Sequence, residues 1–97
     1  MQKGWGEKLV FLMAKTITII HSKTDPNSVH KFRNFGEDIW RAYRDDKRCK
    51  VDLDEIDHAR DRFSITCRNS MVGRAQATIK KLLKAHYLDV DCKAELS

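Results

Sequence analysis

Histidine and cysteine side chains are the groups of this chain best suited to bind a metal ion or to attack a substrate. The cysteines show no CxxC spacing, the arrangement that would hold a soft metal ion between two thiolates. The histidines fall in separate parts of the sequence, with neither HxH nor HxxxH spacing: His21, His30, His58 and His86. We therefore predict no metal site and no cofactor site.

The sequence also lacks a nucleophile that a neighbouring base would activate. No elbow motif surrounds Ser64 or Cys67, so acyl-transfer chemistry is not indicated. The acid-rich segment 52–61 matches no calcium-loop spacing. We predict that the chain has no catalytic residues. One alternative stays open, a small enzyme whose site forms at a dimer interface around His86, Cys67 or Arg62.

Positive charge is concentrated in the second predicted helix. The formal net charge is +5, and residues 69–88 contain no acidic side chain. A basic stripe of this kind can bind the phosphates of a nucleic acid without reading its bases, and the free N–H groups where a helix begins also favour anions. The candidate nucleic-acid or anion-binding residues are Arg68, Asn69, Arg74, Lys80, Lys81 and Lys84. The alternative is a basic helix face that is only solvated.

Alternating strand and helix patterns must position these residues. Apolar residues at period two predict strands, and apolar residues at helical spacing predict helices. The expected elements are a strand at 15–21, a helix opening at Asp25-Pro26, a strand at 49–53, a hairpin connection at 57–61, a strand at 62–67, a helix capped by Asn69 or Ser70, and a strand at 89–96. This order is typical of an α+β ferredoxin-like two-layer α/β plait. In that fold two helices lie on one face of a four-stranded antiparallel sheet.

The two faces of the predicted elements differ in chemistry. On the first helix, Arg33, Glu37 and Arg41 form an i, i+4 charge ladder opposite the apolar stripe. The predicted free face of the sheet carries no aromatic residue, so stacking of bases on it is excluded. The loop 21–27 contains neither glycine nor arginine, which excludes the phosphate cradle of an acylphosphatase.

Residues 1–12 are predicted to be an N-terminal extension, disordered or forming an extra edge strand, and residues 13–97 to form a single domain. The apolar run 9–14 is too short for a secretory signal or a membrane span. Either Met1 or Met13 is the native start. Three cysteines are an odd number, which argues against a disulfide framework and favours a reducing, cytoplasmic setting.

The function expected from these patterns is that of a small non-enzymatic binding or assembly domain, homodimeric through its sheet face or a strand edge. Ile20 and the run Leu9–Met13 would supply apolar contacts for such a dimer. The alternative function is sequence-nonspecific binding of nucleic acid or another polyanion through the basic face of the second helix. No membrane partner and no small-molecule substrate are expected.

Overall fold

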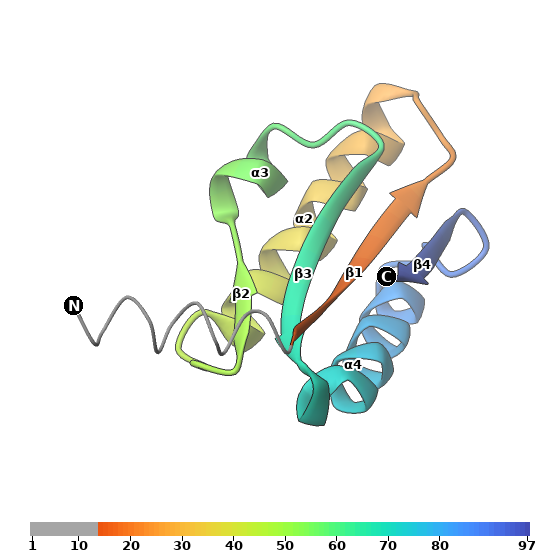
Figure 1. Ribbon diagram of the computed structural model, residues 1–97. Coiled ribbons are helices and arrows are strands. Elements are labelled where there is room, and N and C mark those ends of the chain that lie inside the picture. The colour runs from red at the N-terminus through yellow and green to blue at the C-terminus, as the bar shows by residue number, and fades with distance from the viewer. Residues whose placement is uncertain (1–13) are drawn as a thin grey trace.

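The computed structural model describes residues 14–97 and has an α+β architecture built on one antiparallel sheet (Figure 1). Its elements are β1 (Ala14–His21), α2 (Pro26–Tyr43), β2 (Cys49–Val51), α3 (Leu53–Asp57), β3 (Arg62–Arg68), the 3-10 helix η1 (Asn69–Met71), α4 (Val72–Ala85) and β4 (Cys92–Leu96). The four strands lie in the order β2-β3-β1-β4. The predicted class and the four-stranded antiparallel sheet are confirmed. The expected extension at residues 1–12 lies outside the described residues.

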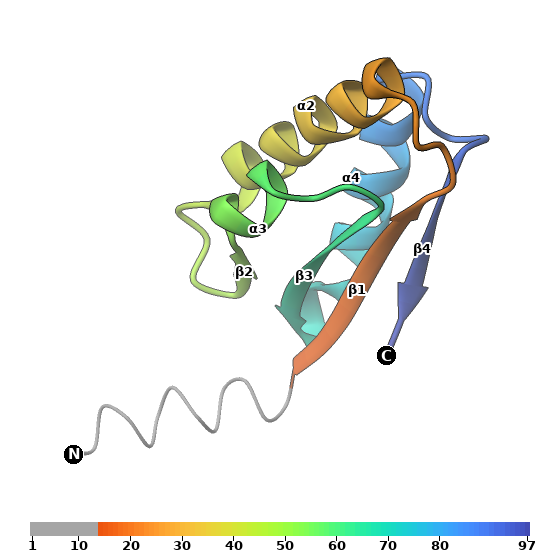
Figure 2. The same cartoon turned by 90° about the horizontal axis from the view of Figure 1, so that it is seen from above.

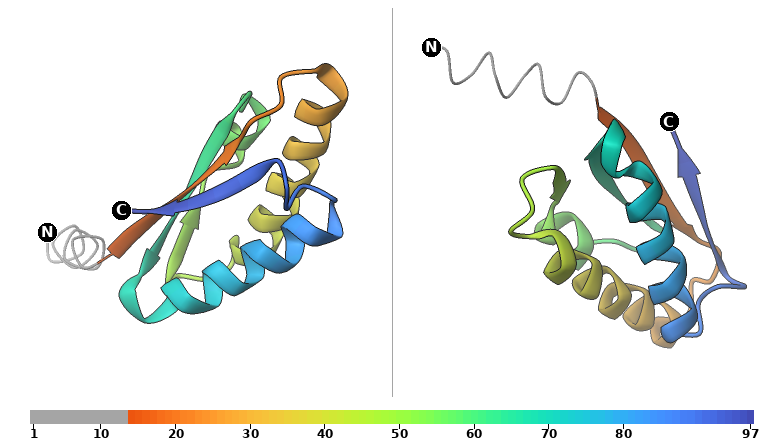
Figure 3. Two further views of the ribbon diagram at one scale, coloured as in Figure 1. Left: turned by 90° about the vertical axis from the view of Figure 1, so that its right-hand side faces the viewer. Right: turned by 90° about the horizontal axis from the view of Figure 1, so that it is seen from below.

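The two long helices form a second layer on one side of the sheet. Figure 2 shows α2 and α4 on the same side of β1 and β3, and Figure 3 shows the opposite sheet face without a long helix over it. Within residues 14–97, no helix is long and apolar enough to cross a membrane. The layering places the α4 side chains that point away from the sheet in solvent.

Alternation in the two central strands builds the core. Ile17 and Ile19 of β1 are fully buried and lie opposite Ile65 and Phe63 of β3 in the antiparallel register. Phe32 of α2 packs on this layer, with 5.2 Å between its ring centroid and that of Phe63. Burial of β-branched and aromatic side chains against a pleated surface is what favours strands at these positions.

α2 begins where the sequence predicts. The side chain of Asp25 accepts a hydrogen bond from the backbone N–H of Ser28 at 3.1 Å, and Pro26 occupies the first helical turn. Farther along, Gly36 faces Ile56 of α3 so closely that a Cβ atom on the glycine would lie 2.6 Å from the Ile56 Cγ2 atom. The absence of a side chain at this one position lets α3 pack against α2.

The segment after β2 is helical, whereas the sequence predicted that the strand continues through residue 53 and that a hairpin connection follows at 57–61. The Asp52 side chain accepts hydrogen bonds from the N–H groups of Asp54, at 2.9 Å, and Glu55, at 3.4 Å, and α3 starts there. Ile56 is fully buried as part of that helix. A local N-cap and one apolar contact therefore outweigh the strand alternation that precedes them.

The last strand is shorter than predicted, because the chain first makes a turn after α4. Tyr87 has a positive φ of 57°, and Val90, which lies within the predicted strand 89–96, is 90% exposed. β4 starts at Cys92 instead of residue 89. Ala94 and Leu96 do lie on the helix side of the sheet, opposite the buried positions of β1, but Leu96 remains 45% exposed. The helix layer therefore leaves the inner face of β4 partly uncovered.

Candidate polyanion-binding face

The core contacts of α4 fix which of its sides is exposed. Val72, Ala75, Ile79 and Leu83 are buried and recur at the i, i+3, i+7 and i+11 spacing of one helix face. All other positions of the helix except its half-buried flank therefore project toward solvent. This arrangement follows directly from the apolar periodicity of the sequence.

The predicted anion-binding residues are all exposed. They are Arg68, Asn69, Arg74, Lys80, Lys81 and Lys84. Within residues 14–97, none of their side chains forms an ion pair or a hydrogen bond. The five cations are therefore solvated, and no carboxylate of the described residues forms an ion pair with them.

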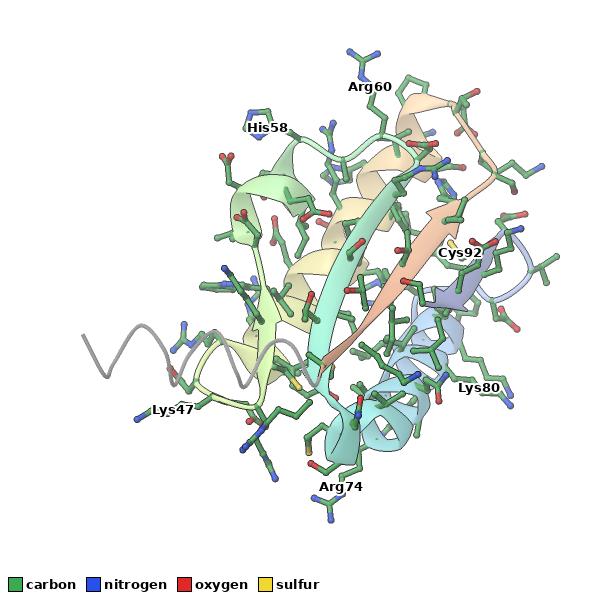
Figure 4. All side chains as sticks on the ribbon, viewed as in Figure 1. Lys47, His58, Arg60, Arg74, Lys80 and Cys92 are labelled. Atoms are coloured by element: carbon green, nitrogen blue, oxygen red, sulfur yellow. The ribbon has the colours of Figure 1, made fainter. Side chains whose placement is uncertain are left out.

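The cations lie in two rows on α4. Lys80 and Lys84, one turn apart, occupy the side toward β4, and Arg74 and Lys81, two turns apart, occupy the outer side. Figure 4 shows Arg74 pointing out at the N-terminal end of α4 and Lys80 pointing out on the β4 side. Arg68 ends β3 and precedes η1, so it adds its charge at the same end as Arg74. We refer to these five cations and Asn69 as the basic face.

The N-terminal end of this helical segment has no side-chain cap. The sequence predicted that Asn69 or Ser70 caps the second helix, and this is wrong, because Asn69 lies inside η1 and neither η1 nor α4 has a side-chain cap hydrogen bond. The first turn of α4 also contains no acidic residue. Gly73 has open space around it, since a Cβ atom there would meet nothing within 4 Å. The positive end of the helix dipole thus adds to the charge of the basic face.

The arginines of α2 and of the loop after it have intramolecular partners. Arg41 pairs with Asp38 at 2.8 Å and with Glu37 at 3.4 Å, so part of the predicted charge ladder is present. Arg33 leaves that ladder, because its Nε donates to the carbonyl oxygen of Ala59 at 2.9 Å.

The loop after α2 adds a further paired arginine. Arg48 and Asp46 form an ion pair at 3.0 Å, and hydrogen bonds from Arg48 lower the pKa of Asp46. Some exposed cations elsewhere have no ion pair with any described residue, but they lie apart from one another: Lys23, Lys31, Lys47 and Arg60.

The three residues considered for an enzymatic site are not brought together around one cavity. Nε2 of His86 lies 2.7 Å from Oδ2 of Asp38 on α2. Arg62 pairs with the neighbouring Asp61. Cys67 is fully buried opposite Cys49, and burial raises the pKa of both thiols, that of Cys49 to about 12.

Such thiols stay protonated near neutral pH and are poor nucleophiles. All three cysteines of the chain are free. Within residues 14–97, no group of three or more histidine, cysteine or acidic side chains is arranged to hold a metal ion.

The uncovered sheet face is polar and its side chains pair across the strands. The hydroxyl oxygens of Thr18 and Ser64 lie 3.1 Å apart, and those of Thr16 and Thr66 lie 3.4 Å apart. Hydroxyl pairs of this kind stabilise the β1–β3 ladder and offer no flat ring to a base.

Two features have no counterpart in the sequence prediction. His21 is 2% exposed, its ring stacks 4.9 Å from that of Phe32, and neither ring nitrogen has a hydrogen-bond partner among the described residues. Its position at the inward register of β1 could have been found from the alternation that already included Ile17 and Ile19. The second is a groove of about 430 Å³ between α4 and β4, which cannot be predicted from any local sequence pattern.

Comparison of the chain with protein-family models, with curated proteins and with solved structures finds no match. The assignment of a function therefore has to come from the geometry and charge described above.

Proposed function

We propose that the protein is a non-enzymatic binding domain whose basic face binds polyanions, above all the phosphate backbone of a nucleic acid. The observation that carries the proposal is that five exposed cations lie on and beside one helix without a single ion pair among the described residues. Like charges one turn apart, such as Lys80 and Lys84, destabilise an isolated helix by about 0.2–0.5 kcal/mol. The phosphates of a bound ligand would neutralise these charges and so remove the repulsion between them.

The chemistry of the basic face favours backbone contacts over base recognition. Lysine and arginine side chains neutralise phosphates and release counterions, which gives affinity without sequence information. The uncapped start of η1 and α4 offers N–H groups and a positive dipole end to the same ligand. No aromatic side chain belongs to the basic face, so stacking on bases adds nothing there. The binding is therefore proposed to be independent of sequence.

We further propose that the fold is a ferredoxin-like plait. The strand order β2-β3-β1-β4 and the placement of the two long helices on one face support this assignment, with α3 and η1 as additions. We place the function in the cytoplasm, a setting that three free cysteines favour.

The proposal is tested by titrating the full chain with a short mixed-sequence oligonucleotide and recording amide NMR spectra at low and moderate salt. We expect shifts confined to residues 68–84 that diminish as salt is raised. The double variant K81E/K84E should bind at least about tenfold more weakly and with a shallower dependence of log K on log salt.

The matched control is K47E/R60E, which makes the same change in net charge at two exposed cations away from α4 (Figure 4). Binding by the control close to that of the wild type would tie the loss to the basic face. Equal losses in both variants would mean that net charge alone governs binding, and unchanged binding by K81E/K84E would overturn the proposal.

A further inference from the structure

β4 has an outer edge that no described strand covers. Thr16 and Ser97 exchange N–H···O bonds in both directions, at 3.1 and 2.9 Å, which sets the hydrogen-bonding phase between β1 and β4. The polar backbone groups of Lys93 and Glu95 therefore point toward β1, and those of Ala94 and Leu96 point outward. Exposed edges of this kind are templates for pairing with another strand.

The charges on β4 are arranged so that the strand complements itself. Lys93 and Glu95 flank Ala94 on the sheet face without long helices, where they pair with each other at 3.0 Å and remain 69% and 55% exposed. In a dimer each would exchange this partner for its counterpart on the second copy. An antiparallel pair of β4 strands centred on Ala94 sets Lys93 of one copy opposite Glu95 of the other, twice. These are non-hydrogen-bonded pairs, in which Cα atoms lie about 4.5 Å apart and side chains are closest.

Shifting this pairing by one position removes the complementarity. A two-fold axis at Lys93 sets that lysine opposite its own copy, and an axis at Glu95 sets the glutamate opposite its own copy. Like charges directly opposite each other are unfavourable, while opposite charges contribute roughly 0.2–1 kcal/mol. The sequence of β4 therefore specifies one register among the neighbouring ones.

The helix side of β4 supplies apolar contact in the same register. Leu96, 45% exposed, would lie opposite Cys92 of the second copy, which lines the groove of about 430 Å³ beneath α4. Ile79 and Leu83 form the apolar part of the α4 wall of that groove, and Gln76, Lys80 and Lys84 line the rest of that wall. The leucine that each copy leaves exposed would thus extend over the groove that the other leaves open.

We propose that the protein forms a two-fold homodimer by antiparallel pairing of the β4 edges, centred on Ala94. The outward N–H groups of Ala94 and Leu96 then find carbonyl acceptors on the second copy, and the two sheets join into one. This assembly does not require a polyanion. Both α4 helices lie on the same face of the joined sheet, so the two basic faces lie on one side of the dimer.

The test reverses the charges of Lys93 and Glu95, which lie opposite each other across the proposed interface. Self-association is measured by sedimentation velocity of the full chain without nucleic acid, over a wide concentration range. We expect a wild-type dimer, and at least about tenfold weaker self-association for K93E and for E95K alone, each of which sets like charges opposite each other. An equimolar mixture of these two variants restores complementarity and should associate as the wild type does. The double variant K93E/E95K should also recover.

Two further variants separate this edge from other interfaces. Ala94→Pro removes an outward N–H that the β1–β4 ladder does not use, so the monomer should keep its fold, checked by circular dichroism, and lose dimerisation. Ile20→Thr removes the apolar side chain from the uncovered sheet face without adding a charge opposite Lys93, and it should leave the dimer intact.

A wild-type protein that stays monomeric throughout overturns the inference. So does a dimer that survives K93E and A94P, or one that I20T abolishes while K93E leaves it unchanged. Lys81 does not line the groove between α4 and β4, so K81E should dimerise normally while it weakens binding of the oligonucleotide. Failure of the polyanion proposal and failure of this one therefore give different results.

Discussion

The two long helices lie on the same side of the same sheet, yet they use their polar residues in opposite ways. On α2, Arg41 pairs with Glu37 and Asp38, and Arg33 donates to the Ala59 carbonyl. On α4, the arginine and the three lysines have no such partners within residues 14–97. An amphipathic pattern alone does not distinguish these cases, because both helices bury one face equally well. The α2 arginines have partners that the protein itself supplies, although Lys31 of the same helix has no ion pair within residues 14–97. The unpaired cluster on α4 is why we propose that helix as the one that binds an external anion.

The same contrast holds for the glycines of the two helices, and it gives the largest expected effect on stability. Gly36 of α2 packs against Ile56 and Phe63, with 2.6 Å from its built Cβ position to Ile56 Cγ2, whereas Gly73 of α4 has nothing within 4 Å. We expect Gly36→Ala to lower the free energy of unfolding by about 1–3 kcal/mol through overpacking. Gly73→Ala should raise it by about 0.4–1 kcal/mol.

Chemical denaturation of both variants measures this difference. If Gly73→Ala destabilised the protein as much as Gly36→Ala, the expected difference between the two helices would be wrong. Other residues would then pack closely against the N-terminal end of α4. Gly73→Ala also tests how closely a ligand approaches the helix. If the added methyl group weakens oligonucleotide binding, the backbone at Gly73 contacts the anion.

Next in size is a pH effect at the end of β1, where His21 packs on Phe32 of α2. The pKa of His21 is lowered from its usual 6.5, mainly because burial disfavours the imidazolium, although Asp91 and Asp25 act in the opposite direction and Lys31 and Lys23 add to the lowering. The unfolded chain therefore binds a proton below about pH 6.5 that the folded chain resists. The contribution of His21 to stability is complete above that pH and is lost as pH falls below it, by up to about 1.4 kcal/mol per pH unit.

His21→Phe isolates this effect, because phenylalanine keeps the ring stack on Phe32 and has no nitrogen to leave unpaired. We expect the variant to be more stable than the wild type near pH 5 and to lose less stability between pH 7 and pH 5. Thermal or chemical unfolding at a series of pH values measures both. His30→Gln replaces an exposed histidine of α2 and should keep the wild-type slope. A slope unchanged in His21→Phe would assign the acid sensitivity to another group.

Sequence reasoning found the elements whose periodicity is strong and missed those that depend on distant contacts. Alternation placed Ile17 and Ile19 in the core, and the Asp25-Pro26 pair gave the start of α2 correctly. The α3 helix was missed because it depends on the Asp52 cap and on the burial of Ile56 against α2, which no local alternation reveals.

For the candidate site, the residues and the exposed helix face were predictable from the sequence. Whether each cation has an ion-pair partner was not. Periodicity shows which positions of α4 face solvent, so the exposure of Lys81 and Lys84 was predictable. The contact of Arg33 with the Ala59 carbonyl depends on how the loops fold back. The same is true of the lack of an ion pair between the cations of α4 and any carboxylate of residues 14–97. The open edge of β4 likewise follows only from the strand order.

The smallest expected effect tests the contrast between the helices directly. Arg41→Gln on α2 breaks two exposed ion pairs and should lower the free energy of unfolding by about 0.2–1 kcal/mol, less at high salt, while leaving oligonucleotide binding close to that of the wild type. Lys84→Gln on α4 breaks no pair and relieves repulsion from Lys80, so its stability should be unchanged or slightly higher, by up to about 0.5 kcal/mol at low salt. Its affinity for the oligonucleotide should fall.

Denaturation and oligonucleotide titration of these two variants at low and high salt test whether the cations of the two helices have different roles. The variants remove the same charge with the same substitution type, one with a built-in partner and one without. If stability and binding move in opposite directions for the two helices, α2 uses its cations for folding and α4 keeps its cations for a ligand. If Lys84→Gln instead destabilises the protein and leaves binding unchanged, the cations of α4 support the fold and the division between the helices fails.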